Sequence, residues 1–459
     1  MRHTRYGFWL EAAGPVEPGP RLEGDTTADV VVVGAGYLGL WTAWQLKALE
    51  PELDVVVLEA GLAGHGPSGR NGGFVSSLWD DLPILRETFG DTRAVETCRA
   101  SERAVDGIGA FCADQGIDAW YRAGGTLQVA TSGAQLGDWD ELVTACRAVG
   151  APEEAQPLTR AEVAARCESP AFLGGMVLRK GANVQPALLS LGLRAKVIGA
   201  GARLYEHTPV RTLSSTAAAT TRDGTVRARA AVLAVNSSTV GFRGFRHALS
   251  VASSHMVITE PVPDVIDEIG WTGGENIHDC RTLLHYLRTT KDGRIALGWA
   301  GGRMGLGARH RDRLDIDPAA ARHAVATLHR FFPQLVGRQV THAWGGPIDV
   351  SPTHLPIFGS RGSVHHGFGF TGNGVGPTNL GGEILARLAL DRRDELTGLP
   401  LVEPDRKLFP PEPLRYLGGT TIRAALVHRD DAHDRGDQTD PLTGFVASLP
   451  RRLGLRLPR

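Results

Sequence analysis

The stretch from Asp29 to Ala60 constrains the fold of this chain more than any other. It begins with four consecutive valines, Val30–Val33, which predict a short strand buried on both faces. The glycines that follow have the spacing G-x-G-x-x-G and open an apolar helix; they are Gly34, Gly36 and Gly39. A second apolar strand, Val55 to Leu58, ends at Glu59. This order predicts a βαβ unit with parallel strands.

The same unit predicts a bound adenine dinucleotide. The first glycine lets the chain turn sharply, the second lets the backbone approach a pyrophosphate, and the third allows close helix–strand packing. The positive end of the helix dipole favours that pyrophosphate. Glu59 follows the last glycine by about 20 residues, where a carboxylate can hold ribose hydroxyls and would repel the 2′-phosphate of NADP. The alternative is a glycine-rich turn in some other βαβ unit.

Size and charge narrow the class of protein. A chain of 459 residues exceeds the usual single core, so we expect two domains. The net charge of −1 favours neither nucleic acid nor a membrane surface as a partner. The five cysteines are dispersed and odd in number, which predicts reduced thiols and a cytoplasmic protein rather than a disulfide framework or a metal site.

The two ends of the chain differ in composition from the rest. Residues 1–27 are rich in Gly, Pro and Glu, and we expect an arm that lies on the surface. The end, Arg451 to Arg459, is basic with interleaved leucines. A solvated tail or a dimer arm is the favoured interpretation of this end, and contact with lipid or an acidic partner is the alternative.

Two further glycine-rich stretches accompany the first. Residues 63–73 combine several glycines with Arg70 and Asn71, a composition suited to backbone that runs close to a flat ligand. Residues 367–376 lead into a predicted helix from Pro377 to Leu390, and proline is favoured in a first helical turn. The alternative for this last stretch is a loop that only packs two elements together.

With these motifs the chain resembles the D-amino-acid oxidase/glycine oxidase superfamily of FAD-dependent amine oxidases. The sequence S-G-R-N-G-G at 68–73 is most similar to the branch that contains gamma-glutamylputrescine oxidases and related oxidases of amines and aminophosphonates. The likeness extends from about Ala28 to Leu417. It implies an α/β fold with a discontinuous Rossmann-like FAD-binding domain and a second, mainly antiparallel β-sheet substrate domain. The implied segments are 28–85, 170–245 and 335–400 for FAD, 86–169 and 246–334 for the substrate, and 401–459 as a C-terminal extension.

The resemblance implies FAD as the cofactor and assigns residues to it. Gly34, Gly36, Gly39 and Glu59 would bind the ADP half, and the backbone of Val210 would lie against the adenine. Near the phosphates and the flavin ring the resemblance places Ser68, Arg70, Asn71, Gly72 and Gly73. A helix N-terminus facing the flavin would stabilise negative charge on it. The residues expected at that N-terminus are Gly372, Asn373, Gly374, Val375 and Gly376.

The candidate catalytic residues lie in His285-Tyr286-Leu287-Arg288, which we expect to form one arm of a hairpin. In the relatives this hairpin forms part of the wall of the substrate cavity. Alternation puts Tyr286 and Arg288 on one face and His285 on the other. We expect Tyr286 and Arg288 to face the substrate, with Arg288 binding a carboxylate or phosphonate in two-point geometry. The alternatives are a packed tyrosine and a solvated arginine, while His285 or His255 could assist deprotonation.

The implied reaction is hydride transfer from an amine-bearing carbon to flavin, giving an imine that hydrolyses to a carbonyl compound, with O2 reduced to H2O2. The alternatives are an amine dehydrogenase with another electron acceptor and a flavin- or nucleotide-binding protein without chemistry. Sarcosine oxidases attach their flavin through a late cysteine, and this chain has none after Cys280. We therefore expect noncovalent FAD, with His65 as the candidate for a covalent link.

Overall fold

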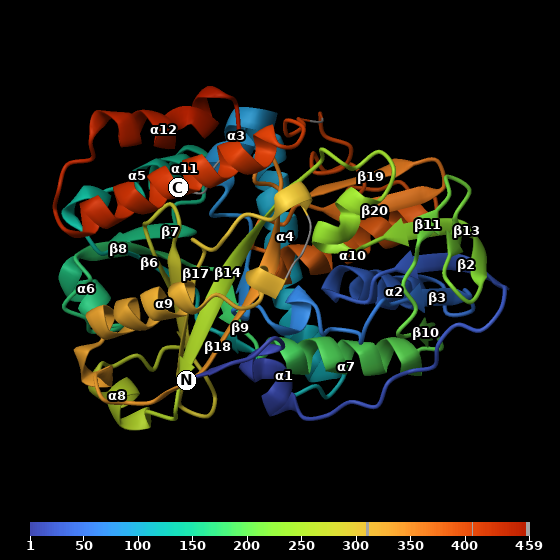
Figure 1. Cartoon of the computed structure of the whole chain (residues 1–459), viewed down its shortest axis with the longest axis horizontal. Helices are drawn as coiled ribbons and strands as arrows, with labels where there is room; N and C mark the ends of the chain where they lie inside the picture. Colours follow the sequence, from blue (N-terminus) through green and yellow to red (C-terminus); the bar gives the residue numbers. More distant parts are fainter. Residues whose placement is uncertain (309–311, 406, 456–459) are drawn as a thin grey trace.

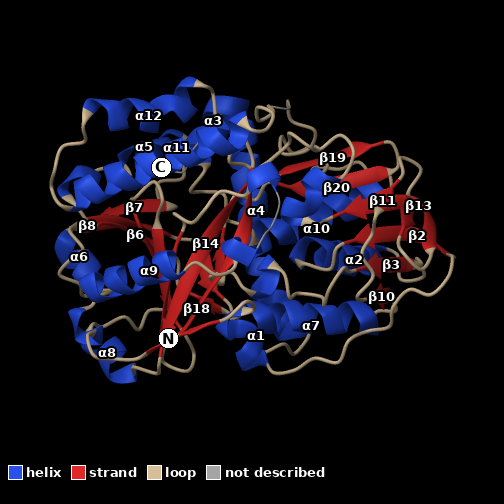
Figure 2. Ribbon diagram, in the orientation of Figure 1, coloured by secondary structure: helices blue, strands red, loops and turns tan. Residues whose placement is uncertain are grey.

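Two large sheets organise the chain, which the computed structural model describes over residues 1–308, 312–405 and 407–455. Figure 1 shows them side by side, with the first dinucleotide strands at one end of the molecule and the second sheet at the other. Helices lie between the two sheets and around the second one, while strands and loops form the outer end of the first (Figure 2). The architecture is therefore mixed α/β, as expected from the sequence.

The first sheet is built around parallel strands. Its main path runs β10-β3-β2-β13-β12-β11, and β20 pairs with β13 and β19. The strands are β2 (Thr26–Val33), β3 (Val55–Leu58), β10 (Arg203–Tyr205), β11 (Thr212–Leu213), β12 (Ala218–Thr220), β13 (Thr225–Leu233), β19 (Ile357–Arg361) and β20 (Val364–Phe368). Its helices are α2 (Tyr37–Leu49), α7 (Pro186–Gly199) and α10 (Val375–Ala389). Because β2, β3, β10 and β13 run parallel, this is the Rossmann-like half.

The second sheet has nine strands in the order β1-β18-β14-β17-β16-β15-β6-β8-β7 and is mainly antiparallel. Its strands are β1 (Arg2–His3), β6 (Thr126–Ala130), β7 (Ala155–Leu158), β8 (Gly174–Leu178), β14 (Ser250–Thr259), β15 (Asn276–Asp279), β16 (His285–Thr289), β17 (Ile295–Trp299) and β18 (Val340–Val350). The expected hairpin is confirmed, since β16 pairs with β17 across a turn at residues 290–293. Helices α8 (Pro263–Glu268) and α9 (Pro318–Phe331) belong to this half.

The remaining elements connect or flank these two halves. A small sheet joins β4 (Phe74–Ser76), β9 (Gly181–Asn183) and β5 (Arg122–Ala123). The other helices are α3 (Leu82–Phe89), α4 (Asp91–Asp114), α5 (Asp140–Ala148), α6 (Arg160–Ala164), α11 (Leu414–Asp434) and α12 (Pro441–Arg452). The last two form a C-terminal pair that packs on the β-sheet half (Figure 1). Residues 456–459 of the basic tail lie outside the described residues.

Three expectations about organisation differ from the structure. Strands β8 and β18 belong to the nine-stranded sheet, although residues 170–245 and 335–400 were expected in the FAD-binding domain. The N-terminal segment is not a surface arm, because β1 pairs with β18 and α1 (Gly7–Ala13) buries Phe8, Trp9 and Leu10. These three apolar side chains, placed within a polar segment, give the physical reason for its docking.

Some structural absences can be stated for the described part of the chain. Within it, no helix is long and apolar enough to cross a membrane. The same residues contain no group of His, Cys, Asp and Glu side chains placed to hold a metal ion. All five cysteines are free and buried, which confirms the expectation of unpaired thiols.

Candidate active site

The glycine turn lies between β2 and α2, where side chains have little room. Gly34 has a φ of 102°, and an added Cβ there would lie 2.4 Å from the carbonyl oxygen of Ala234. At Gly39 an added Cβ would lie 1.9 Å from the Gly34 carbonyl oxygen, so any side chain would push α2 away from β2. At Gly36 it would meet the Ser68 hydroxyl at 2.9 Å, on the wall of a cavity. The turn is thus shaped for a ligand at Gly36 and for packing at the other two glycines.

The carboxylate of Glu59 lies beside this turn, at the end of β3. It accepts hydrogen bonds from the backbone N–H groups of Ala35 and Gly61, both at 2.8 Å. Burial raises the pKa of this carboxyl group, while the two N–H groups oppose that effect. Val210 is half-buried against the same sheet. The turn and its fixed carboxylate have the arrangement that binds the ribose of a dinucleotide.

The loop at residues 65–73 covers the N-terminus of α2. The Ser68 hydroxyl accepts a hydrogen bond of 2.8 Å from the Tyr37 backbone N–H, the first residue of that helix. The Asn71 side chain donates to the Ser68 carbonyl at 2.8 Å and accepts from the Gly73 N–H at 2.7 Å. Because its polar groups bond within the loop, Asn71 holds the loop in one shape.

Partners outside the loop fix its position. The buried Arg70 guanidinium donates to Asp315 at 2.8 Å, so its charge is neutralised by a carboxylate. The indole N–H of Trp344 donates to the Arg70 carbonyl at 2.8 Å, and that of Trp9 donates to the Asn71 carbonyl at 2.9 Å. Trp9 comes from the N-terminal segment, which therefore helps to build the site.

The third glycine stretch leads into α10 on the opposite side of the cavity. Helix α10 begins at Val375, directly after the glycines, and no side chain caps its N-terminus. The buried Asp349 carboxylate accepts the Gly369 N–H at 2.5 Å, and its carbonyl accepts the Thr371 N–H at 3.0 Å. Burial raises the pKa of Asp349 to about 7. Asp349 therefore links β18 to the loop before α10.

Three residues of the cavity wall have left-handed backbone although none is glycine. Their φ values are 48° at Asn236, 67° at His354 and 51° at Thr371. All three line the same cavity. Left-handed backbone at a residue with a Cβ costs of order 1 kcal/mol or more, and such strain gathers at functional sites. Their grouping is an independent sign that this wall has been shaped for a ligand.

Tyr286 forms the wall contributed by the second sheet. Its hydroxyl lies 2.7 Å from the Ser254 hydroxyl, and its ring meets Phe74 edge to face at 5.7 Å between centroids. Room for this ring depends on glycines, since an added Cβ at Gly298 would lie 2.0 Å from it and one at Gly72 would lie 2.9 Å from it. Burial raises the pKa of Tyr286 to about 12, so the hydroxyl is protonated at neutral pH.

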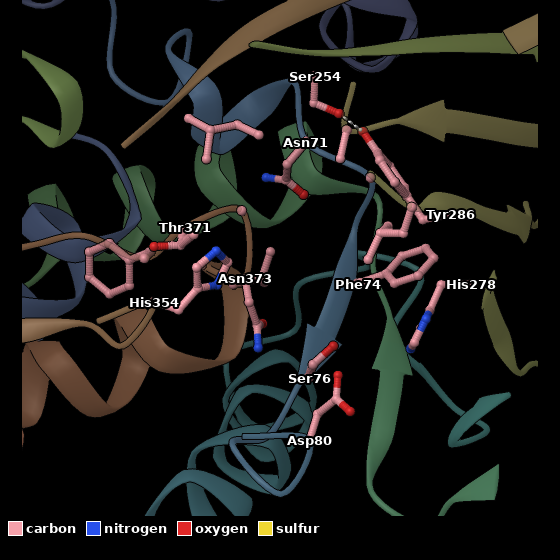
Figure 3. Close-up of a pocket in the computed structure, with 18 of the residues that line it drawn as sticks. Asn71, Phe74, Ser76, Asp80, Ser254, His278, Tyr286, His354, Thr371 and Asn373 are labelled. Atoms are coloured by element: carbon pink, nitrogen blue, oxygen red, sulfur yellow. Dashed lines mark hydrogen bonds between the residues drawn. The ribbon is translucent and has the colours of Figure 1, made fainter. Parts of the chain in front are cut away.

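One cavity lies between the 65–73 loop, the loop before α10 and Tyr286 (Figure 3). His354, Thr371 and Asn373 lie on one side of it, and Tyr286 with Phe74 and His278 on the other (Figure 3). The sequence-predicted residues that line it are Gly36, Ser68, Arg70, Asn71, Gly72, Tyr286, Gly372, Asn373, Gly374 and Val375. Those that do not line it are Gly34, Gly39, Glu59, Gly73, Val210, His285, Arg288 and Gly376. The two glycine loops and the tyrosine are thus brought together, although they are far apart in sequence.

Arg288 does not occupy the position expected of an anion-binding residue. Its side chain is only 2% exposed and donates to the backbone carbonyls of Gly73 and Val184, while its guanidinium lies over the Trp9 ring. No carboxylate pairs with it among the described residues, and burial lowers its pKa to about 9. The expectation that Arg288 holds a substrate anion disagrees with this geometry. Arg288 instead supports the backbone behind the Gly72–Gly73 turn.

The two histidines expected to assist deprotonation also lie behind the cavity wall. His285 is fully buried, with Nδ1 at 2.6 Å from Asp279 and Nε2 at 2.9 Å from Nε2 of His323. His255 is 2% exposed, and burial lowers its pKa to about 4. Neither lines the cavity. Alternation had placed His285 opposite Tyr286, and the strand follows that pattern.

Several cavity residues were missed from the sequence. Ser254, Asp349 and His354 carry polar groups into the cavity or hold its wall, and Phe74 packs on Tyr286. Only Asp349 had a usable signal, since it closes the apolar strand that precedes the late glycine loop. The left-handed backbone of His354 depends on tertiary packing, and no local sequence pattern predicts it.

The described residues fit FAD. The cavity runs without a break from Gly36, where an added Cβ would intrude, past the 65–73 loop to Tyr286 and the start of α10. Glu59 supplies a fixed carboxylate beyond its pyrophosphate end. The glycine turn and Glu59 would hold the ADP half, and Asn71, Gly72 and the N-terminus of α10 would lie at the flavin half.

We expect the cofactor to be released when the protein is precipitated with acid. All five cysteines are buried, and none of them lines the cavity. His65 is half-buried against the Tyr6 ring and also lies outside the cavity lining. The measurement is the yellow colour of supernatant and pellet after acid precipitation. Colour that stays with the pellet would contradict this expectation and would indicate a covalent flavin. Colour in the supernatant of the His65→Ala variant would then locate the covalent link at His65.

Comparisons with known proteins agree with this geometry. The family model described as "FAD dependent oxidoreductase" (DAO) matches residues 29–388. The chain is 29% identical over 415 residues to gamma-glutamylputrescine oxidoreductase of Escherichia coli, covering 87% of this chain and 92% of that protein. It is 28% identical over 439 residues to a probable oxidoreductase of Rhizobium meliloti, covering 91% of this chain and 94% of that protein.

Solved structures show the same fold. Glycine oxidase from Geobacillus kaustophilus superposes with a TM-score of 0.68 at 20% identity, covering 83% of this chain and 99% of that one. An L-amino acid deaminase from Proteus vulgaris superposes with a TM-score of 0.67 at 20% identity, covering 87% of this chain and 98% of that one. Because the family model matches most of the sequence, this chain belongs to the DAO family of FAD-dependent oxidoreductases.

Proposed function

We propose that this protein oxidises a small amine. The substrate carbon bearing nitrogen loses a hydride and the nitrogen loses a proton; water then hydrolyses the resulting imine to a carbonyl compound and ammonia or a smaller amine. FAD supplies the hydride acceptor when it is bound. The observation that carries the proposal is that the Tyr286 oxygen is available as a hydrogen-bond acceptor. It lies in the same cavity as the 65–73 loop and the glycine loop before α10.

The Tyr286 oxygen is an acceptor on the cavity wall. The Ser254 hydroxyl donates to the Trp299 carbonyl at 3.0 Å, so its single proton is committed. The 2.7 Å contact between Ser254 and Tyr286 must then use the tyrosine proton. The tyrosine oxygen keeps its lone pairs for a ligand that donates, and an amine N–H is such a donor.

The other wall residues orient the substrate and exclude water. The rings of Phe74 and Tyr286 provide an apolar face on which the reacting carbon can lie. Asn71 and Asp349 fix the two loops on either side through backbone hydrogen bonds. Such fixed positioning of the reacting atoms accounts for much of the rate in enzymes that leave the bond chemistry to a cofactor.

The names of relatives support an amine as the substrate class. The E. coli relative is named gamma-glutamylputrescine oxidoreductase, and the structural neighbours include a glycine oxidase and an L-amino acid deaminase. Each of these names denotes a compound with an amino group. They support the class of reaction without identifying the substrate of this chain.

O2 is the proposed electron acceptor, and a different acceptor is the second candidate. A cation beside the flavin would favour reduction of O2 by stabilising negative charge. Lys180 is the one lysine that lines the described part of the cavity, and it pairs with Asp106 at 2.7 Å. The described lining therefore offers no unpaired lysine to promote the reduction of O2. This favours the second candidate, a dehydrogenase that passes electrons to another acceptor.

Turnover of purified holoenzyme with amines, amino acids and aminophosphonates tests the proposal. We expect one of these classes to yield a carbonyl product, with one H2O2 per product if O2 is the acceptor. Product that forms only with an added electron-accepting dye would support the second candidate. In Tyr286→Phe we expect kcat/KM to fall about tenfold, because loss of one hydrogen bond costs about 1–1.5 kcal/mol. Absence of product with every class, in air and with dye, would contradict the proposed function.

A further inference from the structure

A row of polar side chains crosses the sheet wall of the cavity. Strands β6, β15 and β16 are neighbours, and their register places Gln128 beside His278 and His278 beside Tyr286. All three line the cavity, whereas the alternate residues Leu127 and Ile277 enter the core on the other face. The row continues the wall beyond Tyr286, away from the oxygen that is proposed to meet the reacting amine. Gln128 is two strands from Tyr286, roughly 10 Å at ordinary strand spacing.

The far end of this row has hydrogen-bonding capacity that no described residue uses. Gln128 is 7% exposed, lines the cavity, and its carboxamide has no hydrogen-bond partner in the described chain. His278 is 9% exposed; its Nδ1 lies 3.1 Å from the Asp279 carbonyl, and its Nε2 has no such contact there. The Gln128 carboxamide opens onto the cavity, so its hydrogen-bonding groups are available to a ligand that enters there. The two side chains therefore indicate a polar ligand group at this end of the cavity.

The charge of the surrounding wall determines the sign of that group. Asp80 and Asp81 line the cavity directly before α3, and no described residue donates a hydrogen bond or forms an ion pair with either carboxylate. Asp81 occupies the N-cap position of α3 without capping it. Figure 3 shows Asp80 beside the cavity below Ser76. Burial and the neighbouring Asp80 raise the pKa of Asp81 to about 8, as expected for a carboxyl group that lacks a cation.

The basic side chains of the described lining are already paired. Arg70 is neutralised by Asp315 at 2.8 Å, and Lys180 by Asp106 at 2.7 Å. Among the lining residues that the structure describes, a substrate with an anionic tail would meet no Lys or Arg side chain that lacks a carboxylate partner. A substrate with a cationic tail would oppose the effects that raise the pKa of Asp81, so that this group could ionise beside Asp80, and would give Gln128 a donor for its oxygen.

We propose that Gln128, His278, Asp80 and Asp81 form a distal subsite that binds a second, protonated amino group of the substrate. The inference rests on the proposed function, in which the first amine lies at Tyr286. The substrate class is therefore a diamine or polyamine whose carbon chain follows the Phe74–Tyr286 wall. The carboxylates and the Gln128 oxygen accept hydrogen bonds from the distal ammonium, and no covalent change occurs there.

Three compounds of equal length provide the first test. Hexamethylenediamine, hexylamine and ω-aminohexanoate end in an ammonium, a methyl group and a carboxylate. We expect kcat/KM to be about tenfold or more higher for the diamine than for hexylamine, as a charge-assisted hydrogen bond would give, and lowest for the amino acid. Equal values for the diamine and hexylamine, or a preference for the carboxylate, would overturn the subsite.

Variants locate the preference within the cavity. We expect Asp81→Asn and Gln128→Leu each to lower the ratio of kcat/KM for diamine over hexylamine about tenfold. Glu96→Gln is the matched control, because Glu96 lies on α4 outside the cavity and pairs with the exposed Arg93. Asp80→Asn is expected to fold because its side chain is exposed, so it can be measured even if Gln128→Leu does not fold. A ratio that stays constant in Asp80→Asn and Asp81→Asn would remove both carboxylates from the subsite and overturn it.

A binding measurement separates this inference from the proposed function. Calorimetric titration of holoenzyme with hexamethylenediamine measures the subsite without turnover. If no amine is oxidised but the diamine binds at least about tenfold more tightly than hexylamine and loses this advantage in Asp80→Asn, the proposed function fails and the subsite stands. If amines are oxidised but the titrations show no such advantage, the subsite fails and the proposed function stands.

Discussion

The Gly36→Val variant is expected to be purified without FAD. An added Cβ at Gly36 would already lie 2.9 Å from the Ser68 hydroxyl, at the point where the cavity meets the N-terminus of α2. The two further methyl groups of valine would occupy the space in which the backbone approaches a pyrophosphate. The measurement is the ratio of flavin absorbance to protein absorbance in the purified variant.

The neighbouring Gly66 provides the control for this experiment. Its backbone is extended, with φ −73° and ψ −155°, and an added Cβ there would meet no heavy atom within 4 Å. Gly66→Val should therefore keep its flavin while introducing the same side chain a few residues from the site. A folded Gly36→Val protein with normal flavin content would contradict the assignment of the glycine turn.

The Arg288→Met variant is expected to be less stable without losing its selectivity among amines. The buried guanidinium donates to the Val184 carbonyl, for which no other donor is present in the described chain, and it lies over Trp9. A buried carbonyl without a donor costs about 1–3 kcal/mol. We expect the free energy of unfolding to fall by about that amount, measured by urea denaturation of the apoprotein.

The same variant distinguishes two roles for Arg288. If the guanidinium bound a substrate anion, stability would be unchanged and kcat/KM would fall selectively for anionic amines. Arg222→Met is the control for stability, since Arg222 has a 77% exposed side chain that pairs with the exposed side chain of the neighbouring Asp223. Unfolding free energies equal for the wild type and Arg288→Met would contradict the supporting role.

Local features of the fold could be predicted from the sequence. The valine strands, the glycine turn and the hairpin at β16 and β17 depend on short periodic patterns, and the structure confirms them. The capping box at α6 is another local signal, since the Thr159 hydroxyl accepts the Glu162 N–H and the Glu162 carboxylate accepts the Thr159 N–H.

Long-range contacts set the rest of the site and could not be predicted. Alternation correctly placed Tyr286 and Arg288 on one face of β16, but it could not show that the turn at Gly73 covers Arg288 while Tyr286 remains open to the cavity. The N-terminal segment was misjudged for the same reason, because its docking depends on surfaces of α7 and β18 that form only in the folded protein.

The most direct test of amine oxidation in this cavity is anaerobic mixing of holoenzyme with the amine that gives the most product. The yellow flavin absorbance should be lost in proportion to the amine added, and one carbonyl product should form for each flavin. In Tyr286→Phe the loss should require more amine, because the acceptor for the amine N–H is gone. An absorbance that stays unchanged with every amine, in holoenzyme that retains its FAD, would contradict the account.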